Sequence, residues 1–185
     1  MPDEAYSLGS SNRAAEPPGS GVPKRLGLIS DTHGWLDPRA LFALAAEMPL
    51  AGIVHAGDIG DIGIIDDLEM LAPPVTAVLG NCDYGQVPGM PTEQIARVTI
   101  AGRTVLVIHD FGDLGPIPDD VDVVVRGHSH SPSVQWRDDV LVVNPGSATQ
   151  RRHQPGCSIG ILEVAEDGEI SARIIELDAF GERTR

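Results

Sequence analysis

The 185-residue chain has little cysteine, few aromatic residues and no long apolar run. Its two cysteines, Cys82 and Cys157, are too few for a disulfide framework and form no CxxC pair, which suits a reducing compartment. Residues 1–23 are rich in Gly, Ser, Pro and Ala and contain neither a signal-peptide run nor a membrane span. These absences favour a cytoplasmic protein with no membrane partner.

Basic residues are also scarce, because 13 Lys and Arg stand against 27 Asp and Glu, for a formal net charge of -14. Apart from Arg151-Arg152 no basic stripe is present, so duplex nucleic acid is not an expected partner. These two arginines either reach a substrate phosphate through bidentate hydrogen bonds or lie in solvent, and we favour solvent.

Length and an apolar fraction of 42% fit one globular domain. We expect a flexible N-terminal tail over residues 1–23, a single domain over 24–178 and a short C-terminal tail over 179–185. The first of these segments cannot bury enough apolar surface to offset its ordering entropy. Since only 4% of the residues are aromatic, the core should consist of Val, Ile, Leu and Ala in strands buried on both faces.

The first half of the domain alternates strands and helices. Strands are predicted at 25–30, 52–56 and 75–79, and helices at 38–48 and 61–71. Pro38 suits the first turn of its helix. A turn-rich loop is expected over 80–91.

In the second half helices become scarce and strands dominate. They are predicted at 94–100, 104–108, 121–125, 134–136, 140–143, 158–164 and 170–176. Hairpin turns fit at Ala101-Gly102, Arg137-Asp138-Asp139 and Glu166-Asp167-Gly168. We therefore expect these later strands to be mostly hairpin-connected and to pack as a second sheet. Two facing sheets flanked by helices is the simplest α/β architecture.

Polar side chains collect where the predicted strands end. The segments are Asp31-Thr32-His33, Gly57-Asp58, Gly80-Asn81, His109, Gly127-His128-Ser129-His130 and Asn144-Pro145-Gly146-Ser147. Any one of these segments alone is explained more simply by an Asp that makes a turn hydrogen bond or by a His at the surface. Five of the six histidines, however, lie at or beside these breaks, His153 being the exception, and core histidines have no reason to gather there. A metal cluster explains the pattern better.

The donors mix carboxylate, carboxamide and imidazole without thiolate, which suits Mn, Fe, Ni or Zn and argues against calcium and structural zinc. They are enough for two ions about 3.5–4 Å apart that share Asp58. Two divalent ions would keep the pocket positive although the protein is acidic, so a phosphate ester is the expected partner. The predicted ligands are Asp31, His33, Asp58, Asn81, His109, His128 and His130.

The ordered series DTHG, HAGD, GNCD, a single His after a strand, GHSH and NPGS resembles the calcineurin-like metallophosphoesterases over residues 25–177. More narrowly, it is similar to the small YfcE-like phosphodiesterases. The resemblance implies a four-layer α/β/β/α sandwich of two facing mixed sheets, with manganese as the leading cofactor. It also implies one ion held by Asp31, His33, Asp58 and His130 and another held by Asp58, Asn81, His109 and His128.

The activity implied is hydrolysis of a small phosphate ester, a nucleotide among the candidates, by a metal-bridging hydroxide. Asp58 and Asn81 are the expected catalytic residues, with Asn81 touching the phosphate as well as its metal. Three alternatives stay open: a protein-binding scaffold of the same fold, a phosphomonoesterase, and a regulatory protein that binds nucleotide without cleaving it. Homo-oligomerisation also stays open.

Two positions depart from the family pattern. Cys82 stands where larger phosphatases place a histidine that protonates the leaving oxygen, and a thiol with a pKa of about 8.5 is a poor substitute. We therefore expect slow turnover of simple monoesters, unless Cys82 is only a small buried packing residue. Asp110 follows His109 where relatives place glycine; it either orients an imidazole or faces solvent. His55 and Asp83 flank ligands, but a strand end and a turn explain them without a catalytic role.

Overall fold

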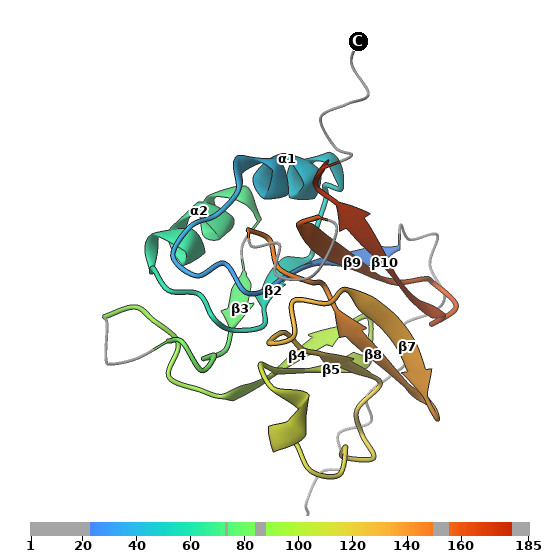
Figure 1. Ribbon diagram of the computed structural model, residues 1–185. Helices are drawn as coiled ribbons and strands as arrows, with labels where there is room; N and C mark the ends of the chain where they lie inside the picture. The colour runs from blue at the N-terminus through green and yellow to red at the C-terminus, as the bar shows by residue number, and fades with distance from the viewer. Residues whose placement is uncertain (1–22, 73, 84–87, 150–155, 179–185) are drawn as a thin grey trace, which may run out of the picture.

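The computed structural model describes residues 23–72, 74–83, 88–149 and 156–178. Residues 1–22 of the predicted N-terminal tail, the whole C-terminal tail, Arg151-Arg152 and His153 therefore lie outside the described residues. Within the described ranges the chain forms two five-stranded mixed sheets with flanking helices (Figure 1). The predicted fold class is confirmed.

The first sheet has the strand order β10-β9-β1-β2-β3. In chain order its strands are β1 (Lys24–Ile29), β2 (Gly52–His55), β3 (Val75–Ala77), β9 (Ser158–Val164) and β10 (Ile170–Glu176). Strands β1, β2 and β3 are parallel, and β9 is antiparallel to β1.

The expectation that the later strands all join the second sheet is wrong for β9 and β10. Ile159 of β9 packs with the helices, whereas Leu162 of the same strand packs between the two sheets. A strand buried on both faces needs a place inside a covered sheet, and the second edge of β1 provides it.

The second sheet has the order β4-β5-β6-β8-β7. Its strands are β4 (Ile95–Ile100), β5 (Arg103–Ile108), β6 (Val123–Val125), β7 (Ser133–Arg137) and β8 (Val140–Asn144). Strands β5, β6 and β8 are parallel, and the two edge strands run antiparallel to their neighbours. Ala101 and Gly102 link β4 to β5 with φ values of 47° and 80°, as a primed two-residue turn requires.

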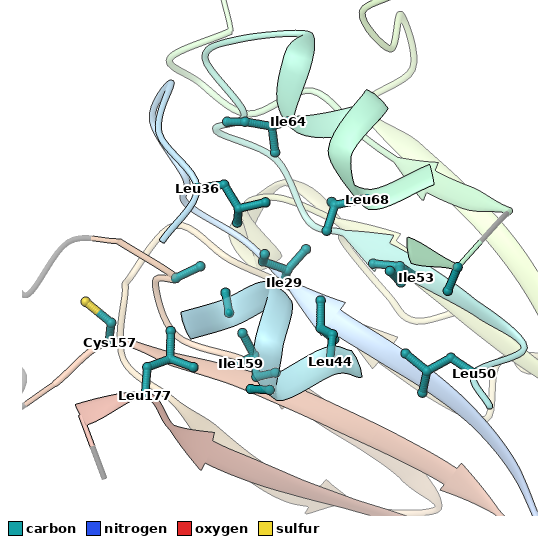
Figure 2. Packing of buried hydrophobic residues seen from close by; sticks show 14 of the residues in the cluster. Ile29, Leu36, Leu44, Leu50, Ile53, Ile64, Leu68, Cys157, Ile159 and Leu177 are labelled. Atoms are coloured by element: carbon teal, nitrogen blue, oxygen red, sulfur yellow. The ribbon is translucent and has the colours of Figure 1, made fainter. Parts of the chain in front are cut away.

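Two helices, α1 (Pro38–Ala46) and α2 (Gly63–Leu71), cover the face of the first sheet that points away from the second sheet (Figure 1). Their Leu44 and Leu68 pack against Ile29, Ile53 and Ile159 of the sheet (Figure 2). No aromatic side chain is among the buried hydrophobic residues of the described ranges, which confirms the expected aliphatic core. Neither α1 nor α2, nor any other helix in those ranges, is long and apolar enough to cross a membrane.

A second core fills the space between the sheets, where Leu28 and Val54 meet Val107, Val123 and Val143. The outer face of the second sheet is covered by a loop that contains a short 3-10 helix, η1 (Phe111–Asp113). This loop forms the fourth layer of the fold. The loop covers the strands β5, β6 and β8, whereas β7 stays largely exposed, so the polar loops after β5 and β6 rest on strands that are packed on both faces.

Candidate metal centre

The seven predicted donors follow parallel strands whose carboxyl ends meet at one edge of the molecule. Ligand sites of α/β proteins are typically found at such an edge. Asp31 and His33 follow β1, Asp58 follows β2, Asn81 follows β3, His109 follows β5, and His128 and His130 follow β6.

Asp31, His33 and His130 form what we call the buried half of the cluster. Nε2 of His130 lies 3.2 Å from Oδ1 of Asp31 and 3.2 Å from Nε2 of His33. The side chains of Asp31 and His130 are 0% exposed. Nε2 of His33 lies 3.7 Å from Oδ2 of Asp58.

Asn81, His109 and His128 form the open half. Oδ1 of Asn81 lies 3.0 Å from Nε2 of His109 and 2.9 Å from Nδ1 of His128. Nε2 of His109 lies 3.4 Å from Oδ1 of Asp58. The side chain of His128 is 47% exposed. One oxygen of Asp58 therefore faces the buried half and the other faces the open half.

Five of the seven donors have a backbone in the left-handed region. This conformation costs a non-glycine residue about 1–3 kcal/mol and persists only where the surroundings hold it. Among the described residues, the other non-glycine residues with positive φ are Ala101 and Asp138, which lie in hairpin turns. Strain thus concentrates at this edge. The φ values are 54° at Asp31, 48° at His33, 55° at Asp58, 69° at His128 and 54° at His130.

Glycines let the donor loops approach one another. A Cβ on Gly80 would lie 2.2 Å from the backbone nitrogen of Asp58, and one on Gly57 would lie 2.8 Å from Cβ of His109. Neither position can take a side chain without moving a donor. This explains why a glycine precedes both Asp58 and Asn81.

Hydrogen bonds hold the loops in these conformations. The backbone N–H groups of Asp31, His33 and Gly34 donate to the carbonyls of Gly57, Asp58 and Ile59 at 3.0, 2.9 and 2.7 Å. From the segment after β8, Ser147 Oγ donates to the carbonyl of Asp31 at 2.8 Å, and Asn144 Nδ2 donates to that of Gly127 at 2.9 Å. The NPGS segment thus supports the donor loops rather than supplying donors.

The pKa values of the two carboxyl groups shift in opposite directions. Burial raises the pKa of Asp31, although a hydrogen bond from Ser30 and the charges of His130 and His109 oppose the shift. Burial also acts to raise the pKa of Asp58, but hydrogen bonds from His109 and the Cys82 backbone outweigh it and lower the pKa. A ligand carboxyl binds a cation in its ionised form, so a bound cation would oppose the effect of burial on the pKa of Asp31.

The side chains fit divalent cations. Oδ1 of Asp31 is buried and makes no hydrogen bond to any described residue, so a cation would complete its contacts. Ligand atoms of Asp31, His33 and His130 all lie within 4.8 Å of one another, as do those of Asp31, Asp58 and His109. This mixture of carboxylate and imidazole suits borderline divalent ions.

Cys82 is exposed, so the alternative that it is a buried packing residue is wrong. Its backbone N–H donates to Oδ1 of Asp58 at 2.7 Å, and its Sγ lies 3.4 Å from Nδ2 of Asn81. Asp110 places Oδ2 at 3.7 Å from Nε2 of His128, while its Oδ1 accepts the N–H of Gly112. The side chain of Asp110 is 42% exposed and lies beyond hydrogen-bond distance of the imidazole, so it faces solvent beside His128.

Sequence reasoning left out Asp83 and His55, and both contact the donor loops. Asp83 accepts the N–H groups of Gly60 and Gly80, each at 2.8 Å, and so ties two loops together. His55 is 0% exposed and places Nε2 at 2.9 Å from Oγ1 of Thr32. Their positions beside donor segments were the only signal of these contacts in the sequence.

A cavity of about 170 Å³ adjoins the open half of the cluster. Apolar side chains of Leu79, Ile95 and Ile108 form part of its wall. Asp110 and Asp113 also line it, together with Asn81, His109 and His128. A small organic group could therefore lie directly beside three of the predicted ligands.

Two facing mixed sheets with an Asp–His cluster at one edge make this chain a candidate metallohydrolase. A family model described as the calcineurin-like phosphoesterase superfamily domain matches residues 25–167. The chain belongs to this superfamily.

Individual relatives agree with the family and confirm the predicted likeness to small phosphodiesterases. The probable metallophosphoesterase MJ0623 of Methanocaldococcus jannaschii is 33% identical over 164 residues, covering 83% of this chain and 81% of the archaeal protein. The phosphodiesterase YfcE of Escherichia coli K12 is 27% identical over 161 residues, covering 75% of this chain and 87% of YfcE.

Solved structures agree in fold. The structure of YfcE, a phosphoesterase from E. coli, matches with a TM-score of 0.61 and 22% identity, covering 83% of this chain and 99% of YfcE. Vacuolar Protein Sorting 29 from Cryptosporidium parvum matches with a TM-score of 0.64 and 19% identity, covering 83% of this chain and 97% of that protein. At these identities the likeness supports the fold alone.

Proposed function

We propose that this protein is a metal-dependent phosphodiesterase that hydrolyses small phosphate esters with two divalent ions, manganese first and Ni, Fe or Zn as alternatives. One observation carries the proposal: the two oxygens of Asp58 lie 3.7 Å from Nε2 of His33 and 3.4 Å from Nε2 of His109. This carboxylate would therefore be shared between ions in the two halves. Asp31, His33 and His130 would complete one site, and Asn81, His109 and His128 the other.

When bound, the ions would supply Lewis acidity, stabilising charge on the phosphoryl oxygens and readying a water for attack at phosphorus. The chain itself mainly positions groups. Its rigid loops hold the donors before substrate arrives, which lowers the reorganisation needed during the reaction. Asn81 lies in the open half, where its amide can reach a substrate phosphate.

The preference for diesters follows from the poor supply of a proton for the leaving group. The exposed thiol of Cys82 stands beside Asn81 and is a weak general acid near neutral pH. Activated esters release acidic alcohols that need little protonation. A monoester of a simple alcohol reacts through a loose transition state that puts more charge on the leaving oxygen than a diester does, so it depends more on a proton donor. Simple monoesters should therefore turn over slowly.

The cavity beside the open half favours an uncharged alcohol group on the substrate. Its wall combines Leu79, Ile95 and Ile108 with the carboxylates of Asp110 and Asp113, and no Lys or Arg of the described residues lines it. A further phosphate on that alcohol would meet like charge there. Compact diesters with neutral alcohols are thus the proposed substrates, in a cytoplasmic protein.

The decisive experiment strips the purified protein of metal, reloads it with Mn²⁺, Ni²⁺, Fe²⁺ or Zn²⁺, and measures bound metal by elemental analysis. Each form is then assayed on bis(nitrophenyl) phosphate and nitrophenyl phosphate. We expect hydrolysis that depends on added metal and is faster on the diester. A protein that turns over neither ester with any ion would instead support the alternative of a protein-binding scaffold with the same fold.

A further inference from the structure

We propose that His55 is a positioning residue for the metal centre: through Thr32, its imidazole fixes the loop after β1 against the loop after β2. The inference rests on the proposed function, because the role assigned to His55 is to hold Asp31, His33 and Asp58 in place for the ions. His55 itself touches neither ion nor substrate in this scheme.

The hydrogen-bond directions follow from the donor count. Oγ1 of Thr32 lies 3.0 Å from the carbonyl oxygen of Ile59 and 2.9 Å from Nε2 of His55. A hydroxyl has one proton, and a carbonyl can only accept. Thr32 therefore donates to Ile59 and accepts from His55, so the imidazole must carry its proton on Nε2.

The other ring nitrogen agrees with this tautomer. Nδ1 of His55 is buried and makes no hydrogen bond to any described residue. At this buried nitrogen, a lone pair without a hydrogen-bond donor costs less free energy than an N–H group without an acceptor. Burial lowers the pKa of His55 to about 3, with the charge of His109 adding to the shift. The ring is thus neutral under ordinary conditions and adds no positive charge beside the cations.

Thr32 is the residue through which such a contact has most effect. It lies between Asp31 and His33, which both have positive φ values, and it makes none of the cross-loop backbone bonds that Asp31, His33 and Gly34 make. Its link to the second loop is its hydroxyl, which lies 3.0 Å from the carbonyl oxygen of Ile59 and 3.5 Å from that of Asp58. His55 orients that hydroxyl from inside the first sheet. One imidazole thereby couples both loops.

The first test compares three variants of the full chain. His55→Leu removes the donor with little change in size, His55→Gln retains an N–H donor, and Val54→Ala, on the same strand, opens a gap in the core away from the loops. Mn²⁺ affinity is measured by titration calorimetry, and the stability of the metal-free protein by denaturant unfolding. Both quantities are needed to separate positioning from general destabilisation.

We expect His55→Leu to weaken Mn²⁺ binding by about tenfold or more, the scale seen when groups that orient ligands are removed. His55→Gln should recover most of that loss, and Val54→Ala should lower stability without weakening Mn²⁺ binding. Affinity in His55→Leu equal to the wild-type value, or an equal loss in Val54→Ala, would overturn the inference. If the wild-type protein binds no Mn²⁺, the inference and the proposed function both fail.

A second measurement needs no variant and stays informative if His55→Leu does not fold. Nitrogen NMR of the histidine side chains in the wild-type protein distinguishes the two neutral tautomers. We expect His55 to be protonated at Nε2 and bare at Nδ1. A proton on Nδ1 would overturn the hydrogen-bond arrangement, even if the protein hydrolyses phosphodiesters.

Discussion

The two halves of the donor cluster contain similar side chains and differ most in the exposure of His130 and His128. In the buried half, Asp31 and His130 are 0% exposed, and their loops rest on hydrogen bonds to the segments after β2 and β8. In the open half, His128 is 47% exposed and lines a cavity together with Asn81 and His109. The buried half is thus part of the folded core, whereas the open half is where substrate can arrive.

Both halves meet at Asp58, so the largest effect should come from Asp58→Asn. Losing the shared carboxylate removes several kcal/mol of charge stabilisation, and we expect diester hydrolysis to fall by about 10³-fold or more. Steady-state rates and bound metal measure the change. Asp67→Asn, an exposed position on α2, is the matched control and should keep both. Full activity in Asp58→Asn would contradict a shared ligand.

His130→Ala and His128→Ala compare the two halves directly, because both positions have positive φ and strain the new alanine alike. His130→Ala leaves a buried gap and should lower the melting temperature of the metal-free protein by about 5 °C or more. His128→Ala should change it by no more than about 2 °C. Both should bind less metal. Equal melting temperatures in the two variants would contradict the claim that the buried half contributes more to the stability of the fold than the open half.

A smaller effect concerns pH. Unfolded His55 takes up a proton below its ordinary pKa of 6.5, whereas folded His55 stays neutral until pH about 3. The unfolded state therefore binds more protons within this window, and folded stability falls as pH decreases, by up to about 1.4 kcal/mol per pH unit. The raised pKa of Asp31 acts in the opposite direction, contributing stability at low pH that is lost as pH rises.

The contribution of His55 to this pH dependence is isolated by comparing the unfolding free energy of the wild-type protein with that of His55→Leu. Denaturant unfolding of the metal-free wild-type protein and of His55→Leu at several pH values gives the difference in unfolding free energy. As pH decreases from 6.5, the wild-type protein should lose stability relative to His55→Leu. Parallel curves would mean that His55 gains a proton in the folded protein as readily as in the unfolded one.

The mildest prediction concerns the leaving group. Cys82→His, at an exposed position beside Asn81, supplies a better proton donor and should raise monoester turnover by about tenfold, with little change for activated diesters. The ratio of the two rates is the measurement. An unchanged ratio would mean that position 82 does not supply the proton, and Cys82→Ser is the control for loss of the thiol.

The convergence of the donor side chains at one edge could be predicted because the signal there is local. An apolar run that ends in Asp31 or His109 marks a strand end, and carboxyl ends of parallel strands meet. The convergence of donors after β1, β2, β3, β5 and β6 follows from that rule. Strand bounds also depend on local pattern, and β9 and β10 match the prediction residue for residue.

What the sequence did not predict depends on partners far along the chain. Nothing near Leu162 indicates that it pairs with Leu26, so β9 and β10 were placed in the wrong sheet. The exposure of Cys82 depends on which groups surround its loop in space. The role of His55 depends on Thr32 and Ile59, which belong to two different loops. The local sequence pattern carries no information about contacts between residues that lie far apart in the chain.

The strand order of the first sheet has a consequence for biosynthesis. Strand β1 lies between β2 and β9, with Leu26 opposite Gly52 on one side and opposite Leu162 on the other. On the ribosome, β2 emerges soon after β1, but the other edge of β1 waits until nearly the whole domain has been translated. Nascent chains should therefore expose an unpaired edge during synthesis, a state that invites aggregation and chaperone binding.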